Sequence, residues 1–482
     1  MTTSRLLFAD QLGTHFLGDD EQPIVLIEST AALRRRRLHR ARAHLVLSAL
    51  RHRAAELGER ATVVRAETYG EALERVKGPV EVVHPTSREA LAVVRRHGLR
   101  VLPARGFITS HAFFEEWAAS NRLQLEGFYR HVRRHTGVLM ADDKPEGGRW
   151  NYDADNRQPP PRGATELGAP QPWWPEEDEI DDEVRRDLDT WDIPTIGADG
   201  PRRFAATTAE AEAALQHFIV KRLPLFGPHE DAMLDADPWM AHSMLSVPLN
   251  LGLLDPQRAV AAAARADAPL ASREGFVRQV LGWREYIWHL YWHLGPDYRR
   301  SNALSAHAPL PRWFQDLDAD DVSARCLASA LQSVRDYGWA HHIQRLMVLG
   351  SWALQRGYDP AALSDWFRAS FVDGAAWVMD PNVIGMSQYA DGGVVATKPY
   401  TSGGAYLHRM SDHCSSCRYS PQHRSGDTAC PFTTGYWAFL QRNADALAGN
   451  RRMQQPLASM RRLRDLAEAI ESSEQFDRDS PP

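Results

Sequence analysis

The chain has 482 residues, of which 43% are hydrophobic and 24% charged, with a formal net charge of −6 at pH 7. This length exceeds one compact core, so we expect two or three domains. No stretch approaches the roughly 18 apolar residues of a membrane-spanning helix, and the first residues lack a signal peptide's apolar run. These features exclude a membrane protein and predict a cytoplasmic one. The 56 basic residues are nearly all arginine, which leaves a local nucleic-acid-binding face open despite the acidic total.

Residues 1–140 alternate short aliphatic runs with amphipathic segments. The strand-like runs are 5–10, 23–29, 61–67, 79–85 and 100–103, and the helix-like segments are 31–57, 69–76 and 87–98. Such alternation predicts βαβ units, a parallel sheet and a doubly wound α/β domain. No G-x-G-x-x-G follows the first strand, which disfavours an ordinary dinucleotide site there. The basic run 34–42 has no interleaved aromatics, and we expect it to be a solvated helix face.

Residues 141–205 are rich in proline, glycine and acidic residues and show no periodicity, which indicates a long interdomain connector. A segment of this length without repeats is either wrapped over the surface or functional. Its aromatic residues predict that it is docked on the protein: Trp150, Tyr152, Trp173 and Trp174.

Residues 206–450 have apolar residues at helical spacing, and we expect an all-helical domain with no strand after about residue 110. Thr207 and Glu210 form a capping box, and Asp359 precedes a first-turn proline. Residues 451–482 are expected to form a C-terminal helix, with the last dozen residues as a disordered tail.

The four cysteines are too few for a disulfide scaffold in a cytoplasmic protein of this size. Cys414 and Cys417 form a C-x2-C loop, Cys430 follows, and Cys326 is distant in sequence. Thiolates at this spacing can hold one metal centre, with the fourth supplied by folding. From the residues alone the centre is structural zinc, our first choice, or an iron–sulfur cluster. The alternative is a set of unrelated buried thiols.

Hydroxyl and amide side chains gather in the segment 242–256. Ser243 and Ser246, with Asn250 nearby, suit a phosphate or pyrophosphate, and Arg284 in the Trp-rich segment 282–292 could add a charge-assisted hydrogen bond. The alternative, which these residues alone favour, is that Ser243 caps a helix and the tryptophans are core.

His341 and His342 are adjacent on an expected helix, so at most one of them should line a given pocket. A lone histidine of this kind is more often a hydrogen-bonded core residue than a proton donor. Asn382 lies in the amide-rich, loop-like segment 380–393, where it could bind a planar heterocycle or belong to an ordinary turn.

Taken together, several long motifs are similar to those of a known family. They are 125–140 (LEGFYRHVRRHTGVLM), 145–157 (PEGGRWNYDADNR), 242–256 (HSMLSVPLNLGLLDP), 276–288 (FVRQVLGWREYIW), 338–354 (GWAHHIQRLMVLGSWAL), 377–393 (WVMDPNVIGMSQYADGG) and 397–421 (TKPYTSGGAYLHRMSDHCSSCRYSP). With the α/β domain, the long connector and the Trp-rich helical domain, they resemble the photolyase/cryptochrome superfamily. The resemblance narrows to the prokaryotic branch that carries an iron–sulfur cluster.

The resemblance implies three cofactors. A 4Fe–4S cluster, in place of zinc, would be held by Cys326, Cys414, Cys417 and Cys430. FAD would lie in the helical domain, contacted by Ser243, Leu245, Ser246, Asn250, Arg284 and Asn382. A 6,7-dimethyl-8-ribityllumazine antenna would lie in the N-terminal domain.

The activity that the resemblance implies is blue-light-driven repair of (6-4) pyrimidine photoproducts in single- or double-stranded DNA by a monomer. Reduced FAD would donate an electron to the flipped-out lesion, whose unstacking costs least because the bases are damaged. The family's motif assigns a proton-handling role to His342, with His341 beside it and Gln279 facing the lesion. Trp366 and Trp377 would pass electrons inward from solvent.

Two departures from the family pattern weaken parts of this reading. Relatives commonly have Asp-Ala-Tyr where this chain has Asp373-Gly374-Ala375, so an aromatic residue is missing from the usual photoreduction route. The segment 34–52 lacks the His-His pair and the lysine seen in relatives, which leaves Glu28 as a candidate antenna contact.

Other functions stay open at this point. A photoreceptor would use the same cofactors to report light to a protein partner, while a light-independent flavoprotein would use the cluster for DNA binding. The histidines at 341 and 342 and Gln279 favour the repair enzyme over both.

Overall fold

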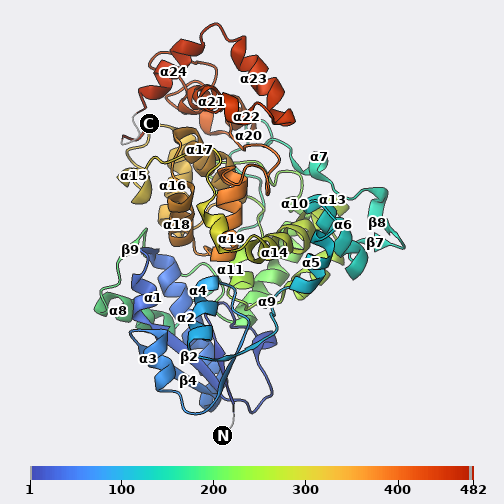
Figure 1. Ribbon diagram of the computed structural model, residues 1–482, viewed down its shortest axis with the longest axis vertical. Coiled ribbons are helices and arrows are strands. Elements are labelled where there is room, and N and C mark those ends of the chain that lie inside the picture. The colour runs from blue at the N-terminus through green and yellow to red at the C-terminus, as the bar shows by residue number, and fades with distance from the viewer. Residues whose placement is uncertain (1–2, 477–479) are drawn as a thin grey trace.

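The computed structural model describes residues 3–476 and 480–482 and has an α/β domain against a larger helical domain (Figure 1). The α/β domain is built on a five-stranded sheet in the order β4-β2-β1-β5-β6, with every neighbouring pair parallel. Its strands are β1 (Ser4–Leu7), β2 (Ile24–Ser29), β4 (Ala61–Ala66), β5 (Val80–Val83) and β6 (Arg100–Leu102). The five strands and the parallel α/β fold predicted from the sequence are confirmed.

The helices of this domain differ from the prediction at one point. Segment 31–57 is not one helix but α1 (Thr30–Arg34), the short strand β3 (Leu38–His39) and α2 (Arg40–Leu57). The other helices are α3 (Tyr69–Glu74) and α4 (Arg88–Arg96). Each of these two begins at a hydroxyl side chain, Thr68 or Ser87, that accepts a hydrogen bond from a backbone N–H of the first turn.

The basic run 34–42 is not a solvated helix face, as we expected, but part of the contact between the domains. Arg36 pairs with Asp365 at 3.4 Å and Arg37 with Asp316 at 2.5 Å. Arg42 is half-buried and donates to the backbone carbonyl of Arg368. These three partners lie in the helical domain. Such long-range contacts cannot be predicted from a local charge pattern.

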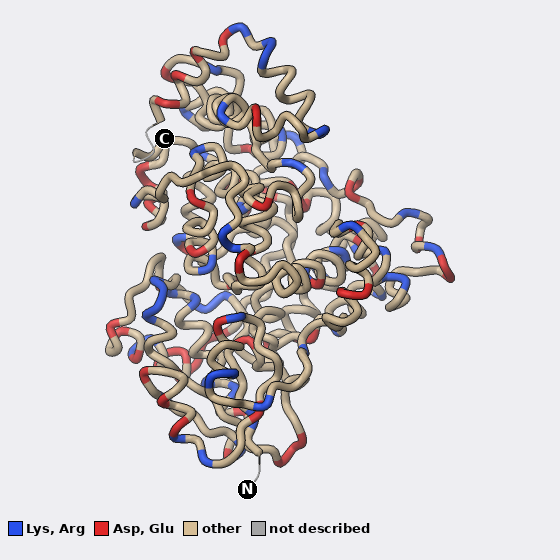
Figure 2. The backbone as a smooth tube through the Cα atoms, in the orientation of Figure 1, with Lys and Arg blue, Asp and Glu red and all other residues tan. Residues whose placement is uncertain are grey.

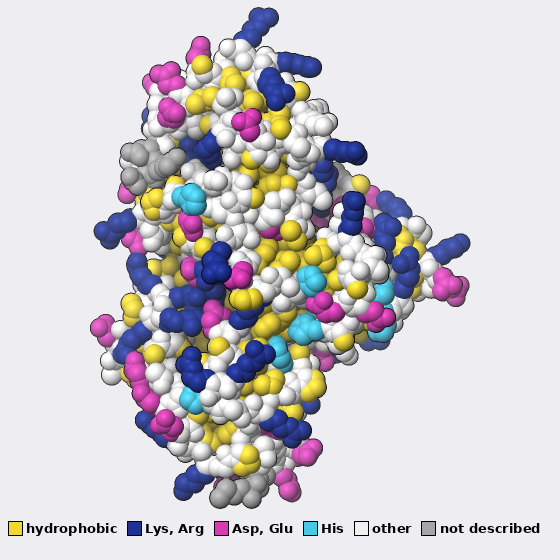
Figure 3. Space-filling view, in the orientation of Figure 1, with side chains coloured by type: hydrophobic (Ala, Val, Ile, Leu, Met, Phe, Trp, Pro, Cys, Tyr) yellow, Lys and Arg dark blue, Asp and Glu magenta, His cyan; other side chains and the backbone are white. Residues whose placement is uncertain are grey.

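The α/β domain ends earlier than the expected residue 140. The helices α5 (His111–Ala118) and α6 (Leu125–Thr136) lie with the helical domain, at the right of Figure 1. The Thr109 hydroxyl donates to Glu285 at 2.9 Å, and the Tyr129 hydroxyl donates to Glu274 at 2.9 Å. Histidine side chains gather over this region in Figure 3.

The connector is docked on the protein, as its aromatic residues predict. Tyr152 is buried, and the ring of Trp174 lies 5.0 Å from that of Trp239. Short elements interrupt the connector: β7 (Met140–Ala141), β8 (Lys144–Pro145), α7 (Asp153–Asn156), α8 (Glu179–Thr190) and β9 (Thr195–Ile196). The three two-residue strands contradict our expectation of no strand after residue 110. They were missed because two residues carry no periodicity.

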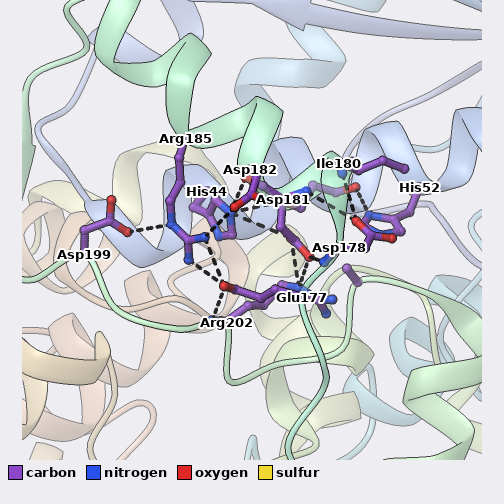
Figure 4. A network of polar contacts seen from close by, with 12 residues as sticks. His44, His52, Glu177, Asp178, Ile180, Asp181, Asp182, Arg185, Asp199 and Arg202 are labelled. Carbon is purple, nitrogen blue, oxygen red and sulfur yellow. Dashed lines mark hydrogen bonds and ion pairs between the residues drawn. The ribbon is translucent and has the colours of Figure 1, made fainter.

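A polar network fixes α8 on α2 (Figure 4). Asp178 caps α8 and lies 3.1 Å from the Nε2 atom of His52, while the fully buried Asp181 accepts from Arg202 at 3.0 and 3.2 Å. The Nε2 atom of His44 lies 3.1 Å from the backbone carbonyl of Asp181. The connector therefore returns to the α/β domain before it enters the helical domain.

The helical domain is formed by many short helices. They are α9 (Thr208–His217), α10 (Leu223–Phe226), α11 (Ser246–Asn250), α12 (Pro256–Ala264), α13 (Leu270–Val277), α14 (Glu285–His293), α15 (Arg312–Gln315), α16 (Arg325–Tyr337), α17 (Ser351–Arg356), α18 (Pro360–Ser370), α19 (Ala376–Asp380), α20 (Gly404–Met410), α21 (Pro431–Arg442), α22 (Ala444–Leu447), α23 (Gln454–Arg461) and α24 (Leu466–Glu474). The capping box at Thr207 and the cap at Asp359 are confirmed. Basic and acidic residues are interspersed over both domains in Figure 2.

Three π-helical segments sit where longer helices pass the centre of this domain. They are η5 (Arg278–Arg284), η7 (Gln344–Gly350) and η8 (Pro381–Ser387). Asn382 therefore lies on a π-helix and not in a loop. Such segments are rare and occur frequently at functional sites, which directs attention to the space between them.

The predicted disordered tail is wrong for the part of it that the structure describes. Ser472 and Ser473 are buried on α24, and an oxygen of Pro482 accepts the backbone N–H of Ser323 at 2.5 Å and of Ala324 at 3.1 Å. The rest of that prediction, at 477–479, lies outside the described residues. Among the described helices, none combines the length and apolarity needed to cross a membrane.

Candidate functional site

A cavity of about 1350 Å³ opens in the helical domain between the three π-helical segments, α11 and α20. It is larger than the roughly 300–1,000 Å³ of ordinary small-molecule sites. The sequence-predicted residues that line it are Ser243, Ser246, Asn250, Gln279, Arg284, His341, His342, Trp377 and Asn382. Positions that are scattered over some 140 residues of sequence thus meet in one space.

Three predicted residues are not among those that line the cavity. Leu245 is fully buried in the core, and Trp366 packs between Phe314 and Phe367. Glu28 lies on the sheet of the α/β domain, where its carboxylate accepts from Arg51 at 2.8 and 3.1 Å and pairs with Arg65 at 2.9 Å. These arginines occupy Glu28, so the structure does not support it as an antenna contact.

The wall beside α11 is organised by Asp373, a residue that the sequence analysis did not list as a site residue. Its carboxylate pairs with both terminal nitrogens of Arg345, at 2.8 and 3.1 Å, and accepts the Ser246 hydroxyl at 2.8 Å. Asn250 donates to the backbone carbonyl of Asp373 at 3.1 Å. Asp373 therefore holds an arginine and two predicted cofactor contacts in place.

The wall beside α11 includes a residue with a strained backbone conformation. Met244, which lies between the two predicted serines and lines the cavity, has a backbone φ of +60°, in the left-handed region that non-glycine residues rarely adopt. Strained residues of this kind cluster at ligand-binding sites, where the surrounding structure holds them in place.

Arg284 is a largely buried cation beside α11, where its guanidinium donates to the backbone carbonyl of Leu249 at 3.4 Å. It donates to the backbone carbonyl of Gly106 at 2.9 Å, and its guanidinium lies 4.3 Å from the ring of Phe107 and 5.2 Å from that of Trp377. Burial lowers the pKa of Arg284 to about 10, with Glu285 opposing the shift, so the side chain stays charged at neutral pH. A charge held this way suits an anionic group such as a phosphate.

His341 and His342 both line the cavity, which contradicts the expectation that at most one would. The helical rule does not apply because His341 precedes the helical turn that begins at His342. His341 is 2% exposed, whereas His342 is exposed and its Nε2 atom lies 3.3 Å from the Oδ1 atom of Asp231. The exposed ring is the one that a bound substrate can reach.

His242 is a third histidine at this site and was missed from the sequence. Its ring stacks on that of His341 at 4.7 Å and meets that of His342 edge-on at 5.6 Å. Burial is the main cause that lowers the pKa of His242 and of His341 well below the usual value, so both are neutral at pH 7. Only the fold reveals this contact, since about 100 residues separate the two positions.

Glu230 is a further buried titratable group in the lining. Burial raises its pKa to about 8, against the opposing effect of the Arg278 guanidinium. The carboxyl group is therefore mostly protonated at neutral pH and can act as a hydrogen-bond donor toward the cavity.

The four cysteines come together from separate elements. Cys326 lies in the first turn of α16, Cys414 in η9 (His413–Ser415), Cys417 just beyond, and Cys430 is the N-cap of α21. None forms a disulfide. Burial raises the pKa of Cys326 well above its usual value, and the other three cysteines raise it further, which shows that the four thiols face one another.

Four cysteine thiols delivered from separate elements are the donor set of structural zinc sites and of iron–sulfur clusters.

A chain of tryptophans leads away from the cavity. The ring of Trp377, which lines the cavity, lies 5.8 Å from that of Trp288, and Trp288 lies 5.6 Å from Trp292. Trp288 is 1% exposed, while Trp292 is only partly buried. The three indoles therefore connect the cavity with the protein surface.

The structure thus has an α/β domain beside a helical domain that contains a large cavity. Residues 5–204 match the model of the family described as deoxyribodipyrimidine photo-lyase-related protein. A (6-4) photolyase from Agrobacterium fabrum is 39% identical over 488 aligned residues, covering 95% of each chain. The chain therefore belongs to the photolyase/cryptochrome superfamily.

Solved structures of low sequence identity share the fold. A bacterial class III photolyase from Agrobacterium tumefaciens is similar with a TM-score of 0.55 at 16% identity, covering 85% of this chain and 86% of that one. A cryptochrome from Synechocystis is similar with a TM-score of 0.57 at 13% identity, covering 100% and 96%. Both of these proteins thus share the fold of this chain, an α/β domain beside a helical domain (Figure 1).

Proposed function

We propose that this chain is a (6-4) photolyase, which repairs (6-4) pyrimidine photoproducts in DNA under blue light with FAD bound in the central cavity. One observation carries the proposal: a single cavity brings the predicted cofactor contacts together with His341, His342 and Gln279. The relative that is similar over 95% of the chain carries that activity in its name.

The residues of the cavity fit FAD. Arg284 offers a buried positive charge to a pyrophosphate, and the Arg345–Asp373 pair with Ser246 and Asn250 forms a polar wall. The volume exceeds that of ordinary small-molecule sites, which leaves room for a nucleotide beside the cofactor. Reduced FAD bound there would supply the electron that light-driven repair of the lesion requires.

Basic side chains at the cavity can receive the DNA backbone. Arg157 and Arg409 are exposed and Lys398 is half-buried, and all three line the cavity. Contacts of arginine and lysine with phosphates position DNA without reading its sequence. A damaged base flipped into the cavity would then meet the histidines.

His342 is the residue that we assign to proton transfer. It is the exposed member of the histidine cluster, and Asp231 fixes its ring through Nε2. A positioned general acid contributes typically 10²–10⁴-fold to a rate. Gln279 lies on η5 in the same lining and is placed to hydrogen-bond the lesion.

The proposal includes a 4Fe–4S cluster on Cys326, Cys414, Cys417 and Cys430. Its support is the all-cysteine donor set, the proximity of the other three thiols to Cys326 and their delivery from separate elements. A ribityl-lumazine antenna in the α/β domain is also part of the proposal, although Glu28 is not free to contact it. Chromophore extraction and chromatography would identify the antenna.

We further propose that electrons reach the cavity through Trp377, Trp288 and Trp292. Trp366, the other candidate, is separated from the cavity by Phe367, which itself lines it and is hard to oxidise. The tryptophan chain offers a route that does not need the aromatic residue replaced by Ala375. The enzyme would act as a monomer in the cytoplasm, which sizing chromatography and fractionation would test.

The test is a repair assay in which the protein is reduced anaerobically, mixed with single-stranded DNA that contains a (6-4) photoproduct and illuminated. The recovery of intact thymines is measured. We expect repair under blue light, and a loss of about 10²–10⁴-fold in His342→Ala. His408→Ala is the matched control, because His408 lines the same cavity outside the cluster and should keep its activity. A reduced protein with full FAD and cluster content that repairs nothing would contradict the proposal and favour the photoreceptor.

A further inference from the structure

Three imidazoles converge in the cavity. One ligand nitrogen from each of His242, His341 and His342 lies within 4.8 Å of the other two. His242 comes from the loop before α11, and the other two from the start of the helix that includes η7. Two nitrogens bound to one zinc ion, with bonds of 2.0–2.1 Å, are roughly 3–4 Å apart. A small rotation of the rings is enough to reach that spacing.

The buried nitrogens of this cluster have no hydrogen-bond partner. Within the described part of the chain, the Nε2 atom of His242 and both ring nitrogens of His341 are unpaired, although these residues are only 7% and 2% exposed. A buried polar group without a partner costs about 1–3 kcal/mol. Such groups in a native protein indicate a ligand, water or ion that satisfies them.

A carboxylate also lies beside the cluster. The Nε2 atom of His342 faces the Oδ1 atom of Asp231 at 3.3 Å. A carboxylate beside one ring nitrogen is the usual partner of a histidine that ligates through the other.

We propose that His242, His341 and His342 form a binding site for a borderline divalent transition ion, with Zn²⁺ as the representative. Three protein nitrogens leave a fourth position open to water or substrate, which is the composition of a reactive and not of a structural site. The ion would occupy the histidine lone pairs that proton transfer needs. Zinc would therefore inhibit repair reversibly, a consequence that rests on the proposed function.

The binding experiment is calorimetric titration of Zn²⁺ into the intact holoprotein, with zinc-edge X-ray absorption to identify the donors. We expect one equivalent bound through nitrogen and oxygen. His242→Gln and His341→Gln should each weaken binding by about 100-fold or more, since even outer partners of a metal site are worth 10–100-fold. His408→Gln is the matched control, and unchanged melting temperatures and FAD content would show that the variants fold.

Several outcomes would overturn the inference. They are sulfur ligation of the zinc, equal affinity in the control and cluster variants, or no saturable binding. In the repair assay, added zinc should inhibit the wild type, and a chelator should restore its activity. Nitrogen-ligated zinc in a protein that repairs nothing would support this site and count against the proposed function. Repair without saturable zinc binding would support the proposed function and count against this site.

Discussion

At the scale of single residues, Glu230 is the clearest source of pH dependence. Its pKa is about 8 in the folded chain because burial disfavours the carboxylate, against an ordinary value of 4.5. The folded state therefore binds more protons than the unfolded state, and Glu230 makes stability fall as the pH rises from about 4.5 to 8. Each unit of pKa difference corresponds to about 1.4 kcal/mol.

We expect Glu230→Gln to flatten the decrease in melting temperature between pH 5 and 8, because the amide cannot ionise. Thermal unfolding at several pH values measures this. Glu166→Gln is the control, since Glu166 is exposed in the connector and should leave the profile unchanged. Parallel profiles for the wild type and Glu230→Gln would show that Glu230 ionises normally.

Residues also show where sequence reasoning works and where it fails. Nine of the residues that line the cavity were named from motifs, because motifs keep whole segments such as 242–256 together. Asp373 and His242 were missed because their importance comes from partners far along the chain: Asp373 meets Ser246, and His242 stacks on His341. The partners of Glu28, Arg51 and Arg65, were likewise not visible from the sequence, and its antenna contact stays a prediction.

At the scale of elements, the cysteine centre connects α16, η9 and the start of α21. Cys326→Ser should abolish iron and sulfide binding and lower the melting temperature, since these elements then lose their shared ligand. Metal analysis and the visible absorption spectrum measure the first effect.

Ser415→Ala is the control for the cysteine centre, because Ser415 lies in η9 beside Cys414 and bonds only the carbonyl of Asp412. This variant should keep its metal. One zinc per chain and no iron in the wild-type protein would instead show that the cysteines hold structural zinc.

The proposed electron route also depends on how two helices are arranged, because Trp288 and Trp292 lie on α14 and Trp377 lies on α19. Trp377→Phe should slow flavin photoreduction by tenfold or more, since phenylalanine is not readily oxidised. The same variant, reduced chemically, should still repair DNA. Transient absorption of the flavin and of tryptophan radicals measures the difference.

Trp366→Phe is the comparison for the electron route and should photoreduce like the wild type, because Phe367 separates Trp366 from the cavity. The opposite ranking of the two variants would move the route to Trp366.

At the scale of the whole molecule, the two domains share one hydrophobic core. The same cluster of buried residues includes Leu26 and Leu45 of the α/β domain and Trp288 and Trp377 of the helical domain. The pair of Glu89 and Arg368, at 2.7 Å, and the basic run 34–42 add charged contacts across the boundary. We therefore expect the domains to unfold together.

Urea unfolding followed by circular dichroism, by tryptophan fluorescence and by FAD release should give coincident single transitions. Separate midpoints for the sheet and for the FAD would contradict a shared core. The sequence indicated an α/β and a helical domain but gave no sign of this coupling, because contacts such as Glu89 with Arg368 join residues far apart in the chain.

The three π-helical segments around the cavity have a consequence for alignments of this chain with relatives. A π-helix closes its hydrogen bonds over one residue more than an α-helix, so each segment is equivalent to a one-residue insertion that leaves the flanking turns in register. Alignments with relatives that have plain α-helices here should therefore show single-residue gaps at η5, η7 and η8. Deleting one residue from such a segment would restore the simpler helix and turn its side chains away from the cavity.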